Sequence, residues 1–317
     1  MEEIRIPNQA TYSPVSLTDV IVAAPLVSRL LLGATLPGRV LQLAALGAYA
    51  GSAIQDWARR QGVRKIDFLR EFGADVRNFE PMPEEARRQE VRVLVERVND
   101  GYVPGRMRRN ELARLVDWHL TEYIARITGQ RVRTSTEVRS FMLMQVLFPF
   151  AVGACDVLSG DIALFRDTGV FEPHVIAHEF CHRKGYLKEL EAQALAYLAL
   201  TSSGDPLLVQ SALCERLHRD LRVLSGGDPE RFRVLVERSG LRAELARQFL
   251  AFRPEPGPLM GPVASLMRSA YDARMRLTGQ NGISDYDLGF TSFLYTFERS
   301  TRARQAPPVA GTVWARS

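Results

Sequence analysis

The sequence predicts an α+β fold that is predominantly helical, with an N-terminal helical region and a small β element in the middle of the chain. Apolar residues recur at helical spacing through most of the chain, and glycines and prolines separate the runs. Between residues 131 and 171 this spacing changes, and the short apolar run 161–165 lies between two turn sequences. With 317 residues, of which 46% are hydrophobic, the chain can bury one large core or two ordinary ones.

The chain is expected to begin with an irregular polar lead-in, residues 1–16, which lacks the features of a cleavable signal peptide. Residues 17–54 then form two apolar runs separated by Gly38 and Arg39, and each run is near or below the length needed to span a bilayer. We expect a helical hairpin that is buried in the protein or lies against a membrane. A membrane-spanning hairpin is the alternative.

Further helices are expected on both sides of the β element. Before it, they lie within 64–78, over 84–98 after two prolines, and from Asn110, a predicted N-cap, to residue 127. After residue 200 the expected helices cover 206–224, 229–237, 241–252, 262–277 and 286–298. We place a domain boundary near residue 130, between a region over 1–130 and a domain over 131–305, although both can share one core. Residues 306–317 are interpreted as a tail.

The most informative stretch is His178-Glu179-Phe180-Cys181-His182, which matches the pattern H-E-x-x-H. On a helix, two histidines four residues apart lie one turn apart, so both imidazoles can reach one cation. Glu179 projects about 100° further round the helix, where it can touch a metal-bound water without binding the metal. The pattern therefore indicates a zinc site for hydrolysis, with two histidine ligands and Glu179 as the base.

The residues around the motif favour a helix, a tight turn and a second helix. Pro173 suits the first turn of a helix, and Gly185 suits the left-handed position after its end. A second helix is expected from about Leu187. Its first turns carry Glu189, Glu191 and Gln193. The turn would bring a third ligand from this second helix back to the histidine pair.

The run His178-Glu179-x-x-His182 followed by Glu189-x-x-Ala192-Gln193 resembles the gluzincin zinc metallopeptidases. The resemblance implies that Glu189 is the third zinc ligand and that Gln193 stands at the position that supports a ligand. That position is Asp or Asn in the family, and the amide of Gln193 cannot supply the usual carboxylate charge. Glu191 is therefore an alternative ligand.

The closest resemblance is to a poorly characterised bacterial family of HExxH peptidases, often with membrane-spanning segments ahead of the catalytic domain. It rests on 178–182, Gly185-Tyr186, 189–193 and the late element 282–286, where an Asp is inserted before Tyr286. The resemblance covers residues 130–300 and implies a gluzincin-like domain in a bacterial protein, cytoplasmic or membrane-associated. It also implies that the β element before the HExxH helix binds the substrate in extended form. A hairpin that only packs against the helix is the alternative.

These observations predict a metallopeptidase with one Zn²⁺ that hydrolyses a peptide or protein by a Glu-activated, metal-bound water. Tyr186 and Tyr286 are candidates for stabilising the transition state, and His174 for supporting the site or binding the metal. One alternative is a zinc-binding regulatory or binding protein without proteolytic activity. A second is a helical membrane-associated or scaffold protein in which the histidines are incidental.

Composition argues against a nucleic-acid partner. The net charge is +5, but acidic residues alternate with arginines along most predicted helices. The densest basic cluster, residues 106–109, is interpreted as a solvated helix entrance, and no nucleic-acid-binding motif accompanies it.

The cysteine content also limits the possibilities. The chain has three cysteines, an odd number, and none of them forms a C-x-x-C pair: Cys155, Cys181 and Cys214. A disulfide framework or a cysteine zinc site is therefore not expected, which fits a reducing compartment. We expect Cys181, inside the motif, to face the core.

Overall fold

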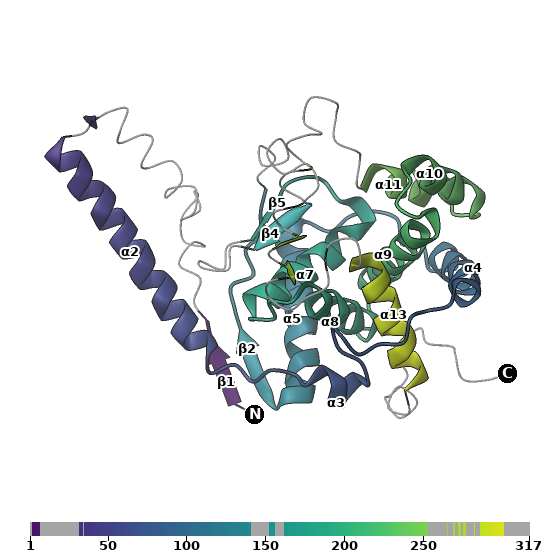
Figure 1. The fold of residues 1–317 in the computed structure, drawn as a ribbon, viewed down its shortest axis with the longest axis horizontal. Coiled ribbons are helices and arrows are strands. Elements are labelled where there is room, and N and C mark those ends of the chain that lie inside the picture. Colours follow the sequence, from purple (N-terminus) through teal and green to yellow (C-terminus); the bar gives the residue numbers. More distant parts are fainter. Residues whose placement is uncertain are drawn as a thin grey trace.

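The computed structural model describes residues 2–6, 32–33, 35–140, 152–155, 162–252 and 286–300, with a few isolated positions between 265 and 282. Helices dominate the described part and short strands form two small sheets, so the predicted, mainly helical α+β fold is confirmed (Figure 1). The elements in chain order are β1 (Glu2–Arg5), α2 (Leu36–Arg60), α3 (Phe68–Phe72), α4 (Glu84–Asp100), α5 (Arg109–Thr128), β2 (Gln130–Arg133), β3 (Arg139–Ser140), β4 (Gly153–Cys155), β5 (Ile162–Leu164), the 3₁₀ turn η2 (Gly169–Phe171), α7 (Glu172–Arg183), α8 (Glu189–Thr201), α9 (Pro206–Ser225), α10 (Pro229–Arg238), α11 (Ala243–Phe252) and α13 (Tyr286–Arg299).

The core is built around α8, which is buried on almost every side. Between Gln193 and Thr201 the helix is apolar all round, the pattern typical of a helix inside a core. Helices α7, α9, α5 and α13 pack against it. One cluster of buried side chains contains Phe68 and Leu120 from before residue 130 and Phe180 and Leu213 from after it. The two expected regions therefore share one core.

The strands form two small sheets. In the first, β1 pairs with β2 in parallel, with Glu2 opposite Gln130. In the second, the order is β3-β5-β4, with β3 parallel and β4 antiparallel to the central β5. The apolar run predicted over 161–165 is confirmed as a strand. The prediction of an irregular lead-in is wrong for residues 2–5, because Ile4 and Ile6 pack with Val132 of β2 in a small separate cluster.

Helix α2 extends away from the rest of the described chain (Figure 1). Several of its large apolar side chains are exposed: Leu36 is 77% exposed, Leu43 69% and Ile54 65%. The expected hairpin is therefore not buried in its second half, residues 36–54, because helix α2 leaves the body of the protein. The other half, residues 17–31, lies outside the described residues. Among the described helices, none is long and apolar enough to cross a membrane.

Most helix positions agree with the sequence analysis. Helices α4, α9, α10 and α13 lie where they were expected. Helix α5 begins earlier than expected, with Arg108 rather than Asn110 as its N-cap. Cys181 has no exposed surface, which confirms that it faces the core. The expected tail and most of the expected helix over 262–277 lie outside the described residues.

Candidate metal centre

Helices α7 and α8, joined by a short turn, carry the candidate site. Helix α7 is seated deeply, since Ile176 and Phe180 are fully buried. It ends at Arg183, and Gly185 adopts a positive φ of 92°, as expected for the residue after a helix end. The Tyr186 N–H then donates to the Cys181 carbonyl, which closes the turn. The start of α8 is thereby brought back beside α7.

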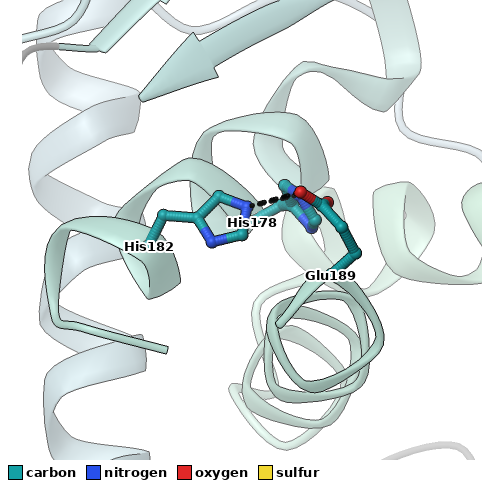
Figure 2. Close-up of side chains that lie close together, drawn as sticks. All are labelled: His178, His182 and Glu189. Atoms are coloured by element: carbon teal, nitrogen blue, oxygen red, sulfur yellow. Dashed lines mark hydrogen bonds and ion pairs between the residues drawn. The ribbon is translucent and has the colours of Figure 1, made fainter. Parts of the chain in front are cut away.

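The turn brings two histidines and one glutamate together, as Figure 2 shows. The Nε2 atom of His178 lies 3.1 Å from Glu189 Oε2 and 3.1 Å from His182 Nε2. The Nε2 atom of His182 lies 3.6 Å from Glu189 Oε1. Atoms that bind one tetrahedral zinc ion lie about 3.3 Å from each other, so these spacings fit three corners of such a site. Two imidazoles and a carboxylate are also a donor set that suits zinc.

The ring of His182 is held in place by the turn. Its Nδ1–H donates to the Tyr186 carbonyl oxygen at 2.8 Å. Because a carbonyl only accepts hydrogen bonds, this contact fixes the proton on Nδ1 and directs Nε2 towards His178 and Glu189. A backbone contact thus orients the His182 ring towards the other two side chains.

The charges around the three side chains favour a cation between them. Burial disfavours the protonated form of His182, but the nearby Glu189 carboxylate outweighs it and raises the pKa of His182 to about 9. Burial alone would raise the pKa of Glu189, but the two imidazoles hold it well below its usual range. Glu189 is therefore a carboxylate, as a metal ligand must be.

Glu179 lies between the histidine pair and strand β4, which is the outer strand among those described. It is 6% exposed, and a Cβ atom placed on Gly153 of β4 would lie 3.6 Å from its Oε1. Burial raises the pKa of Glu179, although both imidazoles and the Cys155 backbone N–H lower it. A carboxylate with a raised pKa next to the ligands is suited to accept and return a proton.

The other residues of the second helix have different partners. Glu191 accepts from the Lys188 ammonium group at 2.8 Å. Among the described residues, Glu191 does not belong to the group of ligand atoms that lie within 4.8 Å of one another. Gln193 donates to Glu215 at 2.8 Å and accepts from the Tyr286 hydroxyl at 3.0 Å. It contributes to a polar network one turn beyond Glu189.

The remaining candidates lie near the site but in different settings. His174 is buried, and burial lowers its pKa to about 4, so its ring is neutral. Tyr186 is 1% exposed, and its ring packs against Phe68. Its backbone carbonyl, rather than its hydroxyl, is the atom that contacts His182. Tyr286 is half-buried, with the Arg219 guanidinium 4.8 Å from its ring centre.

Two residues near the site were not anticipated from the sequence. Glu215 and Arg219 of α9 are 1% and 2% exposed, and they pair with each other behind Gln193. Their spacing of four is also the usual spacing of a solvent-exposed pair on a helix. The sequence does not single them out, because α9 carries other charged residues as well, among them Arg216, Asp220 and Arg222.

Comparison with known proteins gives one match. Residues 168–295 match a family described as a protein of unknown function, DUF3810. This segment is less than half of the chain, but it runs from η2 to α13 and contains all three clustered side chains. No curated protein and no solved structure matches the chain.

Proposed function

We propose that the protein is a zinc-dependent metallopeptidase that hydrolyses peptide bonds. The observation that carries the proposal is the convergence of His178 Nε2, His182 Nε2 and a Glu189 carboxylate oxygen within 4.8 Å of one another. Glu179, adjacent in sequence to the first ligand, adds the base that hydrolysis requires. Three protein ligands leave the fourth position of a tetrahedral ion open, which is typical of catalytic zinc sites.

The three ligands would hold Zn²⁺. When bound, the ion would polarise a substrate carbonyl and lower the pKa of a neighbouring water. Glu179 would accept a proton from the attacking water and then pass it to the leaving amine. Its buried position beside β4 supports this role, because the raised pKa of its carboxyl group makes the proton easier to hold between the two steps.

Strand β4 is proposed to hold the substrate. Among the described strands it pairs only with β5, and its residue Gly153 lies beside Glu179. An extended peptide added to such an edge forms main-chain hydrogen bonds and places its carbonyl groups next to the ligands. The sequence-based interpretation of the β element as a substrate platform therefore stays part of the proposal.

Tyr286 is the better placed of the two tyrosines to stabilise the developing oxyanion. Its side chain is half-buried, and its hydroxyl reaches the face of α8 that carries Glu189 and Gln193. The ring of Tyr186 is enclosed in the core. Tyr286→Phe should lower kcat more than it raises KM, because the lost contact forms mainly in the transition state.

The test is hydrolysis of a peptide library by zinc-loaded wild type and by Glu179→Gln. The proposal predicts cleavage by the wild type, and a Glu179→Gln variant that binds zinc equally well but cleaves roughly 10²- to 10⁴-fold more slowly. Zinc binding without cleavage of any peptide would support the alternative, a zinc-binding regulatory or binding protein.

A further inference from the structure

The turn between α7 and α8, residues Lys184–Tyr186, is the part of the chain that orients His182. Its last residue offers the carbonyl oxygen that accepts from His182 Nδ1 at 2.8 Å. Any shift of this turn therefore moves the acceptor that directs the ring. The contacts that fix the turn decide how firmly His182 is held.

From the inside, the turn is fixed by Lys184. This side chain has no exposed surface, and its ammonium group donates to Thr121 at 2.9 Å and to the Val132 carbonyl at 2.8 Å. It also pairs with Asp117 at 2.7 Å. Two hydrogen bonds and one ion pair thus anchor the turn to α5 and β2.

From the outside, the turn is held by Lys65, which lies in the loop after α2. The Lys65 ammonium group donates to the Gly185 carbonyl at 2.8 Å and to the Lys184 carbonyl at 3.4 Å. It also lies 4.9 Å from the centre of the Tyr186 ring. A Cβ atom on residue 185 would come within 2.4 Å of this ammonium group, so the glycine leaves the room that Lys65 occupies.

We propose that Lys65 is a positioning residue for His182, which it holds through the Lys184–Tyr186 turn. The two carbonyls that it binds follow the end of α7, where a positive charge also interacts favourably with the helix dipole. Residue 65 lies outside the segment that matches the family, 168–295, so the N-terminal region contributes to the candidate metal centre. The consequence for zinc binding rests on the proposed function, whereas the consequence for the His182 ring does not.

Lys188 provides a matched control. It follows the same turn, and its ammonium group pairs with Glu191 at 2.8 Å. Replacing Lys188 by Met removes one positive charge close to the site, as Lys65→Met does, without removing a contact to the turn. Lys65→Arg keeps both the charge and the donors.

The experiment measures solvent exchange of the His182 Nδ1 proton by NMR in metal-free protein with nitrogen-15-labelled histidine. The chain has five histidines, and His182→Gln identifies the resonance. Lys65→Met is expected to speed exchange roughly three- to tenfold, the effect of losing one ordinary, solvent-accessible hydrogen bond. In Lys65→Arg and Lys188→Met the rate should stay within about twofold of wild type.

A second measurement, zinc affinity by competition with a chromogenic chelator, separates the two proposals. Lys65→Met should weaken zinc binding roughly three- to tenfold, less than loss of a direct contact to a ligand. An unchanged exchange rate in Lys65→Met, equal acceleration in Lys188→Met, or no protected Nδ1 proton in the wild type would overturn the positioning role. Faster exchange in a protein that binds no zinc would instead refute the proposed function and leave the role of Lys65 standing.

Discussion

Arg216 offers the clearest test of how the helices of the core are held together. It is 1% exposed, and it binds carboxylates from two other helices, Glu90 of α4 at 3.0 Å and Glu298 of α13 at 2.5 Å. It also donates to the Tyr197 hydroxyl at 3.2 Å. Arg216→Met would leave two carboxylates together without their cation, and we expect the free energy of unfolding to fall by about 3–5 kcal/mol at pH 8.

The loss should depend on pH. Burial raises the pKa of Glu90 from 4.5 to about 7, although Arg216 lowers it. The folded state therefore keeps a proton that the unfolded state releases, and stability decreases as the pH rises from about 4.5 to about 7. Without Arg216 the pKa of Glu90 rises further. At pH 5, where Glu90 is protonated, the loss should be about 1–2 kcal/mol smaller than at pH 8.

The assay is urea unfolding followed by circular dichroism at both pH values. Arg233→Met is the control, because Arg233 also binds two carboxylates, Glu230 and Glu237, but on the exposed face of α10. It should leave stability almost unchanged. The reasoning would be refuted by equal losses for Arg216→Met at both pH values, or by a loss below about 1 kcal/mol at pH 8.

Three further predictions concern the site and α2. In the Glu179→Gln variant, zinc affinity should stay near that of the wild type, since Glu179 is not one of the three clustered ligands; loss of zinc, measured by elemental analysis, would contradict this. Gly185→Ala should lower the free energy of unfolding by about 1–2 kcal/mol, because residue 185 has a φ of 92° that alanine rarely adopts. A thermal melt like that of the wild type would contradict this turn geometry. If residues 17–54 contact a membrane, Leu43→Asp on the exposed side of α2 should reduce cosedimentation with anionic vesicles, and wild type that stays in the supernatant would refute the expectation.

The sequence was most informative where local spacing determines geometry. The i, i+4 spacing of His178 and His182 predicts that both rings lie on one side of a helix, and they meet with their Nε2 atoms 3.1 Å apart. A glycine after the helix end predicts the tight turn, and Gly185 has the positive φ that this requires. These features depend on a few neighbouring residues, so a single sequence suffices to predict them.

The choice between Glu189 and Glu191 as the third ligand could not be predicted from local spacing. The two residues point about 200° apart on one helix, so only one of them can face α7. Which one does so depends on where α8 begins and how the turn directs it. Helix α8 begins at Glu189, which faces the histidines, while Glu191 pairs with Lys188. Helical spacing alone could not decide this.

Long-range pairing accounts for the other features that the sequence did not predict. Strand β1 forms because Glu2 pairs with Gln130, and no local pattern in residues 1–16 indicates that partner. Similarly, Glu215 and Arg219 look like an exposed helical pair until α8 and α13 cover them. The role of Lys65 could not be predicted for the same reason, since the turn that it contacts lies more than a hundred residues away in the sequence.

The central claim is that His178, His182 and Glu189 bind one metal ion. It is tested most directly by zinc titration of metal-free wild type beside Glu189→Gln, with Glu191→Gln as the matched control. The account predicts about one zinc per chain in the wild type and in Glu191→Gln, and binding weakened at least about tenfold in Glu189→Gln. Full zinc affinity in Glu189→Gln with loss of binding in Glu191→Gln would show that Glu191, and not Glu189, is the third ligand. No zinc bound by the wild type would contradict the metal centre itself.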